Sequence, residues 1–279
     1  MRAALLALAF ATAGCVGTPT PLDPSVAGSV GVPHDGVLTN GVELPVRGSG
    51  FRRYRPHGSH YFGNPRLVDA VQRVAAEVER ERPGGAPLLV GDLSAQTGGK
   101  IPGHHSHRTG RDVDLLYYVT TPTGAPVRSP GFVGFDTDGL ARVEYEGDVS
   151  YLRLDVEREW LLVKKLMTAK EVGVQWMFMS RGIEALLIDY ARARGEDDAL
   201  VWHAETVMLQ PGDSTPHADH MHLRIACTPD EMAAGCEGGG PYWQWLPLTP
   251  FPGWLPSAVL DSIAADDPFE LGRLAHSDA

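Results

Sequence analysis

The spacing of apolar residues along the chain predicts a mixture of helices and strands. After Asn64 and Pro65, a pair that favours the start of a helix, apolar residues recur at helical spacing until Pro83. Two more helices are predicted over 155–169 and 183–194, with a polar loop after the second, and buried strands over 87–90, 112–119, 172–179 and 220–226. A hairpin that turns at 136–139 is expected over 132–145. Because helices and strands do not alternate regularly, the pattern favours an α+β fold with a small antiparallel sheet flanked by helices and long loops.

The N-terminus resembles an export signal. Arg2 precedes a short apolar run at 5–13, which is too short to span a bilayer, and small residues come directly before Cys15. Residues 1–14 are predicted to be a signal peptide, and Cys15 to be the lipidated cysteine of a bacterial lipoprotein. The alternative is ordinary secretion with Cys15 unmodified. Both predict a periplasmic protein, and a lipid on Cys15 would tether it to the outer membrane.

Composition then separates a tether, a domain and a tail. Residues 15–48 are rich in Pro, Gly, Ser, Val and Thr and are predicted to be a flexible tether, lipidated or free. Residues 49–255 are expected to form one domain, and 256–279 a C-terminal tail. With 43% hydrophobic and 21% charged residues, the chain can form a sizeable core.

Charge and cysteine content narrow the function further. The formal net charge is −11, which is unfavourable for gripping phosphates and excludes nucleic acid as a partner. Apart from Cys15, the cysteines are Cys227 and Cys236, nine positions apart. In an exported protein this pair predicts a disulfide, because two cysteines without a second pair make a poor zinc site.

Six of the eleven histidines lie in two short windows, 104–107 and 217–222. His107 and Asp114 are seven positions apart, and Gly110 between them allows the loop of His107 to fold over the strand of Asp114. His220 and His222 lie two apart on a predicted strand and therefore share one face.

This pattern predicts a metal site on the sheet. Two imidazoles and one carboxylate are a common ligand set for catalytic zinc, and they leave a fourth position for water. A solvated surface cluster and a structural zinc are the alternatives, although structural sites favour four Cys or His ligands. A redox metal such as copper is disfavoured, because no thiolate or Met set is arranged for it.

The spacing His-x6-Asp followed by His-x-His resembles the zinc motif shared by lysostaphin-type enzymes, D-alanyl-D-alanine peptidases and the hedgehog signalling domain. Within that superfamily the neighbouring residues are similar to those of the penicillin-insensitive murein endopeptidases, over about 36–240. The matching stretches are RPHGSHYFGNPRLVDAVQRV, GDLSAQTGGKIPGHHSHRTGRDVDLLYY, VQWMFMS and PHADHMHLRIACTPDEMAAGC.

The resemblance implies roles for five histidines of the two windows and for Asp114. The implied roles are those of zinc ligands for His107, Asp114 and His222, of the acid/base group for His220, and of substrate-positioning or oxyanion-stabilising groups for His104 and His217. It also implies one zinc ion per chain and a family disulfide between Cys227 and Cys236.

The activity implied by the resemblance is a zinc-dependent cleavage of D-alanyl–meso-diaminopimelyl cross-links in peptidoglycan by a metal-activated water. The domain at 49–255 would then be a zinc metallopeptidase. A D,D-carboxypeptidase or an L,D-specific wall peptidase is the alternative within the superfamily, and a non-catalytic, zinc-containing, wall-binding lipoprotein is the alternative without catalysis.

Two further expectations concern charged neighbours of the motifs. Wall peptides carry carboxylates, and three arginines that flank the motifs are candidates to bind one, namely Arg108, Arg111 and Arg224. Asp112 is a candidate to orient a ligand imidazole, with a solvated acid at the loop edge as the alternative.

Overall fold

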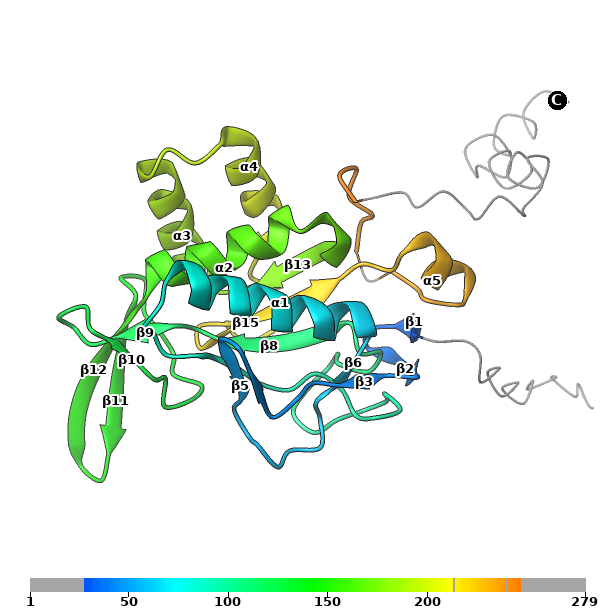
Figure 1. Ribbon diagram of the computed structural model, residues 1–279, viewed down its shortest axis with the longest axis horizontal. Helices are drawn as coiled ribbons and strands as arrows, with labels where there is room; N and C mark the ends of the chain where they lie inside the picture. The colour runs from blue at the N-terminus through cyan, green and yellow to red at the C-terminus, as the bar shows by residue number, and fades with distance from the viewer. Residues whose placement is uncertain (1–27, 213, 239, 247–279) are drawn as a thin grey trace, which may run out of the picture.

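The computed structural model describes residues 28–212, 214–238 and 240–246 (Figure 1). A seven-stranded sheet lies at the centre of these residues. Its strand order is β14 (Met208–Leu209), β13 (Val174–Phe178), β15 (His220–Ile225), β8 (Asp112–Leu116), β7 (Leu88–Val90), β5 (Phe51–Arg53) and β4 (Arg47–Gly48). Neighbouring strands are antiparallel, except that β13 is parallel to β14 and β5 is parallel to β7.

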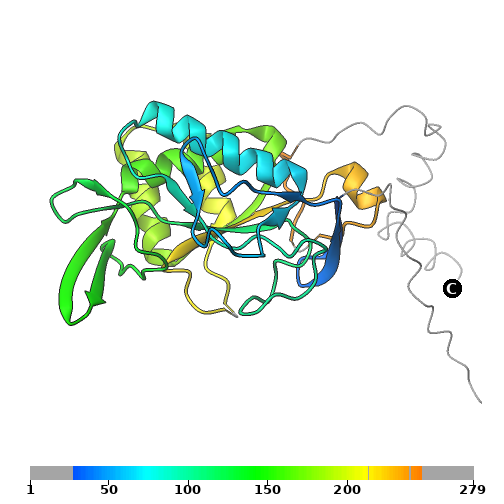
Figure 2. The ribbon, with the colours of Figure 1, turned by 60° about the horizontal axis from the view of Figure 1, so that its bottom comes forward.

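Smaller sheets surround the central one. Two of them have two strands each: β1 (Gly28–Val32) with β2 (Asp35–Thr39), and β3 (Val42–Glu43) with β6 (Phe62–Gly63). The third has the order β10 (Pro126–Val127), β9 (Val119–Thr120), β12 (Asp148–Leu154) and β11 (Leu140–Tyr145). Its β11–β12 hairpin stands out from the body of the molecule in both views (Figures 1 and 2).

Four helices form a layer on one side of the central sheet (Figure 1). They are α1 (Pro65–Glu81), α2 (Val156–Thr168), α3 (Arg181–Ala193) and α4 (Asp198–Val207); η1 (Lys170–Val172) and α5 (Pro229–Ala233) are short. Side-chain caps fix the starts of α1 and α2, because Asn64 accepts from the N–H of Arg66 and Asp155 accepts from the N–H of Arg158. None of the helices in the described part of the chain combines the length and the apolarity needed to cross a bilayer.

The alternation of side chains along β8 and β15 separates the core from the opposite face of the sheet. Val113 and Leu115 belong to the hydrophobic core under the helices, as do Met221 and Leu223. Strand residues point alternately to opposite faces, so the polar residues between them, such as Asp114, point away from the helices. The polar and ionisable side chains of β8 and β15 therefore lie on the face of the sheet that is opposite the helices.

The α+β prediction is confirmed. The central sheet is larger than expected, and its parallel pairs lie towards the two flanks rather than at β8 and β15. The strand predicted over 112–119 ends at Leu116, and the chain continues through two buried tyrosines into β9.

The prediction of a flexible tether is wrong from residue 28 onward. β1 and β2 pair along their whole length, and β1 is fixed to the C-terminal part of the domain. The N–H of Gly31 donates to the carbonyl of Gly235 at 2.8 Å, and the N–H of Glu237 donates to the carbonyl of Gly31 at 3.1 Å. The signal peptide, Cys15 and the C-terminal tail lie outside the described residues.

The predicted hairpin is displaced along the chain. Asp136 does form a turn, and its Oδ1 accepts from the N–H groups of Asp138 at 2.9 Å and Leu140 at 2.8 Å. This turn leads into β11 instead of joining two paired strands. β11 pairs with β12, and the residues between them, Glu146 and Gly147, both have positive φ.

The prediction of a polar loop after the third helix is also wrong, because helix α4 lies there. Asp197 caps this helix, because its side chain accepts from the N–H groups of Ala199 and Leu200. The buried residues of α4 are Val201, Ala204 and Val207, so its apolar stripe is narrow. A stripe this short gives a weak periodic signal.

Candidate metal centre

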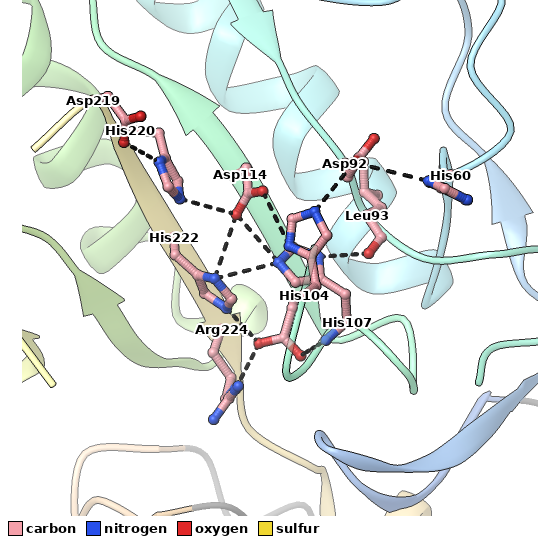
Figure 3. Close-up of polar contacts among 11 residues, drawn as sticks. His60, Asp92, Leu93, His104, His107, Asp114, Asp219, His220, His222 and Arg224 are labelled. Carbon is pink, nitrogen blue, oxygen red and sulfur yellow. Dashed lines mark hydrogen bonds and ion pairs between the residues drawn. The ribbon is translucent and has the colours of Figure 1, made fainter. Parts of the chain in front are cut away.

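Three side chains meet on the free face of the sheet. Asp114 lies on β8 and His222 directly opposite it on β15, while His107 comes from the loop before β8. The Nε2 of His107 is 3.2 Å from Asp114 Oδ1, the Nδ1 of His222 is 3.4 Å from the same oxygen, and the two nitrogens are 3.3 Å apart (Figure 3).

This triangle of atoms has the size that a metal ion requires. A tetrahedral zinc ion with bonds of ~2.0–2.2 Å places its ligand atoms about 3.3–3.5 Å apart. Both oxygens of Asp114 are buried without a hydrogen-bond partner in the described chain. Such a carboxylate is costly unless a cation compensates it. The donor set therefore fits a divalent cation.

The partners of each imidazole fix which nitrogen faces the centre. The Nδ1 of His107 is 2.6 Å from the carbonyl oxygen of Leu93, and the Nε2 of His222 is 2.7 Å from Asp112 Oδ1. Both partners can only accept, so these ring nitrogens carry the protons. The lone pairs of the opposite nitrogens then point towards Asp114, as metal binding needs.

Backbone geometry brings His107 to this position. His107 has a φ of 64°, which is uncommon for a residue with a side chain, and Gly110 has a φ of 71°. A Cβ on Gly110 would lie 2.8 Å from the side chain of Leu38, so the turn also needs the small residue. The expected folding of this loop over the strand of Asp114 is present.

Asp112 is buried below the centre and contacts both imidazole-bearing segments. Its Oδ1 accepts from His222 and also from the Nε of Arg224 at 2.6 Å, and its Oδ2 accepts from the N–H of His107 at 3.4 Å. Burial opposes ionisation of Asp112, but Arg224 and His222 hold the pKa of its carboxyl well below the ordinary value. The solvated-acid alternative is therefore wrong.

His220 lies on the same face of β15 as His222. Its Nε2 is 3.5 Å from Asp114 Oδ1, and its Nδ1 is 2.6 Å from the Oδ1 of Asp219 (Figure 3). The imidazole ring also packs edge-on against Phe132, with ring centres 5.2 Å apart. Asp219 and Phe132 thus fix the orientation of this ring.

The structure also brings His104 and His217 to the centre. The Nδ1 of His104 is 3.8 Å from Asp114 Oδ2, and its Nε2 is 3.2 Å from Asp92 Oδ2. The ring of His217 lies 5.1 Å from that of His220. Burial, together with the neighbouring imidazoles, lowers the pKa of His217 to about 4.

Looser trios of possible ligands also exist in this cluster. Donor atoms within 4.8 Å of one another are offered by His104, His107 and Asp114, and by His217, His220 and His222. The trio of His107, Asp114 and His222 is the tightest, and its spacing is the one that matches a tetrahedral ion.

The cluster lies in a cleft of about 890 Å³. Of the three arginines proposed from the sequence, Arg108 and Arg224 line this cleft. The candidacy of Arg111 is wrong, because its side chain is fully buried and its guanidinium donates to main-chain carbonyls, including those of Glu237 and Gly238. Burial also lowers the pKa of Arg111 to about 10.

Several residues of the site were not predicted from the sequence. Asp92 contacts His104 and lies 3.8 Å from the Nδ1 of His60, and Asp219 contacts His220. Asp219 directly precedes His220 in the chain, which was a usable signal. Asp92 gave a weaker one, since only its position just after the strand ending at Val90 marks it.

Beyond β15 the chain is fixed by the predicted disulfide, and the structure pairs Cys227 with Cys236. Cys227 comes two residues after the end of β15. The bond therefore fixes the segment that leaves the strand carrying His220 and His222.

The fold and the site together define a protein with a candidate His₂Asp metal centre, built on an antiparallel part of a mixed sheet at the base of a cleft. The family model described as penicillin-insensitive murein endopeptidase matches residues 29–242, and the chain belongs to this family. Relatives with this name from Escherichia coli and from Shigella boydii serotype 18 are each 28% identical over 237 residues. These alignments cover 82% of this chain and 78% of each relative. The family expected from the sequence is thereby confirmed.

Proposed function

We propose that this protein is a zinc-dependent murein endopeptidase that hydrolyses D-alanyl–meso-diaminopimelyl cross-links in peptidoglycan. The observation that carries the proposal is the triangle formed by His107, Asp114 and His222, which has tetrahedral spacing and lies beside His220. Membership of the murein endopeptidase family supports the substrate class.

The zinc ion would be held by His107 Nε2, His222 Nδ1 and Asp114 Oδ1. When bound, zinc polarises a carbonyl group and lowers the pKa of a water molecule to about 7, so that peptide hydrolysis needs no serine nucleophile. A β-lactam that acts by acylating a serine therefore has no target here.

His220 would move the proton in this reaction. Asp219 accepts from its Nδ1, so Nε2 is the atom free to exchange a proton, and it faces the centre. It takes a proton from the attacking water and returns it to the leaving amine. Asp219 holds the ring in the orientation that this transfer needs.

His217 would stabilise the negative charge that develops on the scissile carbonyl oxygen. Its pKa of about 4 keeps the imidazole neutral at pH 7, and its Nδ1 is buried without a partner among the described residues. A neutral ring in this place can donate a hydrogen bond without repelling a metal cation. His104 lines the other side of Asp114 and is proposed to position the substrate.

Digestion of purified cross-linked muropeptides, followed by mass spectrometry, tests this proposal. Zinc-loaded protein should convert dimers into monomers, and a chelator should stop the conversion. Release of terminal D-alanine alone would identify a carboxypeptidase instead. A folded, zinc-loaded protein that leaves all muropeptides intact would support the wall-binding alternative.

We also propose that the protein is exported to the periplasm and carries a lipid on Cys15. The support comes from the sequence, since Cys15 lies outside the described residues. Metabolic labelling with palmitate should mark the wild-type protein but not the Cys15→Ala variant. Equal labelling of the two proteins, or none of either, would contradict the lipid anchor.

A further inference from the structure

The cleft differs in charge from the protein as a whole. The chain has a formal net charge of −11, yet three arginines line the cleft, namely Arg55, Arg108 and Arg224. The acids that line it, Asp92 and Asp114, face imidazoles. Carboxylates that enter the cleft would therefore meet cations without a competing acid beside them.

Arg224 already has a carboxylate partner within the protein, since its Nε donates to Asp112 at 2.6 Å. Arg55 and Arg108 differ from it, because neither forms an ion pair with an acid of the described chain. Because no acid of the described residues neutralises these two guanidinium groups, each of them can pair with a carboxylate of a ligand.

The backbone of Arg108 is held firmly in place beside His107. Its N–H donates to the carbonyl of Pro33 at 3.2 Å, and its carbonyl accepts from the N–H of Gly99 at 2.9 Å. The Nε of its side chain is buried and has no acceptor in the described structure. The side chain also lines the cleft, and a guanidinium whose backbone is fixed in this way is suited to bind a carboxylate bidentately.

Arg55 lines the cleft, and a row of aromatic rings connects it to His220. Its guanidinium carbon lies 5.7 Å from the ring centre of Tyr54, and this ring packs edge-on against Phe132 at 5.4 Å. Phe132 in turn packs against His220. Arg108 therefore lies next to His107 in the chain, whereas Arg55 is connected through Tyr54 and Phe132 to His220. Both arginines line the cleft that contains these histidines.

We propose that Arg108 and Arg55 bind two carboxylates of the substrate, one on each side of the scissile amide, and that the enzyme therefore selects acidic over amidated wall peptides. This inference rests on the proposed function, and it names the substrate feature that the cleft recognises. A cross-linked peptide offers such groups, because diaminopimelic and glutamic residues keep free carboxylates.

The test compares a cross-linked muropeptide dimer that has free carboxylates with the same dimer in which the diaminopimelyl carboxylates are amidated. Charge-assisted hydrogen bonds are strong enough that wild-type protein should cleave the acidic dimer with a kcat/KM about 10- to 100-fold higher. Arg108→Gln and Arg55→Gln should each lose most of this preference through a higher KM. The matched control is Arg80→Gln on α1, which lies outside the cleft lining and should keep the full preference.

Binding measurements keep the inference separate from the catalytic proposal. In a zinc-loaded His220→Ala background, calorimetry should show tighter binding of the acidic dimer, Arg108→Gln should reduce the difference, and the double replacement of Arg108 and Arg55 should abolish it. Equal binding of the two dimers, or a preference that survives the double replacement of Arg108 and Arg55, would overturn the inference. Absence of cleavage by wild-type protein, with the binding preference present, would instead refute only the proposed function.

Discussion

Replacing Asp112 by asparagine removes one negative charge from beneath the candidate metal centre while keeping the shape of the side chain. Asp112 is fully buried, and its Oδ1 accepts from both His222 Nε2 and Arg224 Nε. An asparagine oxygen can serve the same two donors, but its NH₂ group would then face the N–H of His107, which is also a donor. The imidazole of His222 loses a charged acceptor, and the loop of His107 loses a hydrogen bond.

The expected size of the effect follows from these contacts. Loss of a partner that orients a ligand imidazole typically weakens metal binding about 10- to 100-fold, or ~1.4–2.7 kcal/mol. The hydrogen bonds made to the charged carboxylate should add a loss of about 1–3 kcal/mol in the free energy of unfolding. Asp112→Asn should therefore bind zinc more weakly and unfold at a lower temperature.

Competition between the protein and a chelator of known zinc affinity, followed with a zinc-responsive dye, measures this change in Kd. Circular dichroism on the same sample shows whether the variant is folded. Asp219→Asn is the matched control, because Asp219 contacts His220 and none of the three proposed ligands. A folded Asp112→Asn protein whose zinc Kd stays within about threefold of wild type would show that Asp112 does not support metal binding through His222.

Three further predictions concern other parts of the molecule. Asp219→Asn should lower kcat on muropeptide dimers about 10- to 100-fold while KM and zinc content stay unchanged, because it disturbs only the orientation of His220. Replacing Cys227 and Cys236 by serine should lower the free energy of unfolding by about 2–4 kcal/mol, measured by urea denaturation. Burial raises the pKa of Glu159 from 4.5 to about 8, so the folded protein retains a proton that the unfolded chain loses. The associated stability is present below about pH 4.5 and is lost as the pH rises through about 8, and Glu159→Gln should remove this pH dependence.

Each of these predictions has an outcome that contradicts it. Unchanged kcat in Asp219→Asn would show that His220 needs no orienting carboxylate. Equal stability of the oxidised protein and the double serine variant would remove the stabilising role of the disulfide. A slope of stability against pH that is the same in Glu159→Gln and wild type between pH 5 and pH 9 would show that Glu159 titrates normally.

The site was more predictable from the sequence than the fold around it. His220 and His222 share a face because strand side chains alternate, and a spacing of two residues is enough to state this. Gly110 predicts the turn that brings His107 back over β8, because the backbone at this position has a positive φ and only a small residue fits there. Local rules of this kind depend on few residues and are readable without the rest of the chain.

Two of the errors have a common physical cause, which is dependence on distant partners. The β1–β2 hairpin has little apolar alternation and is held by main-chain bonds to Gly235 and Glu237, which are about 200 positions away. Arg111 looks like a surface cation in the sequence, but carbonyls at 237 and 238 close over it. Interactions between segments this far apart leave no local pattern.

We propose that a metal held by His107, Asp114 and His222 drives the cleavage of wall cross-links. The most direct measurement is the digestion of cross-linked muropeptide dimers by zinc-loaded wild type and by His222→Ala, with bound zinc quantified in both proteins. We expect about one zinc per wild-type chain and monomeric products, and loss of both zinc and products in the variant. Products at the wild-type rate from a His222→Ala protein that holds no zinc would overturn this proposal.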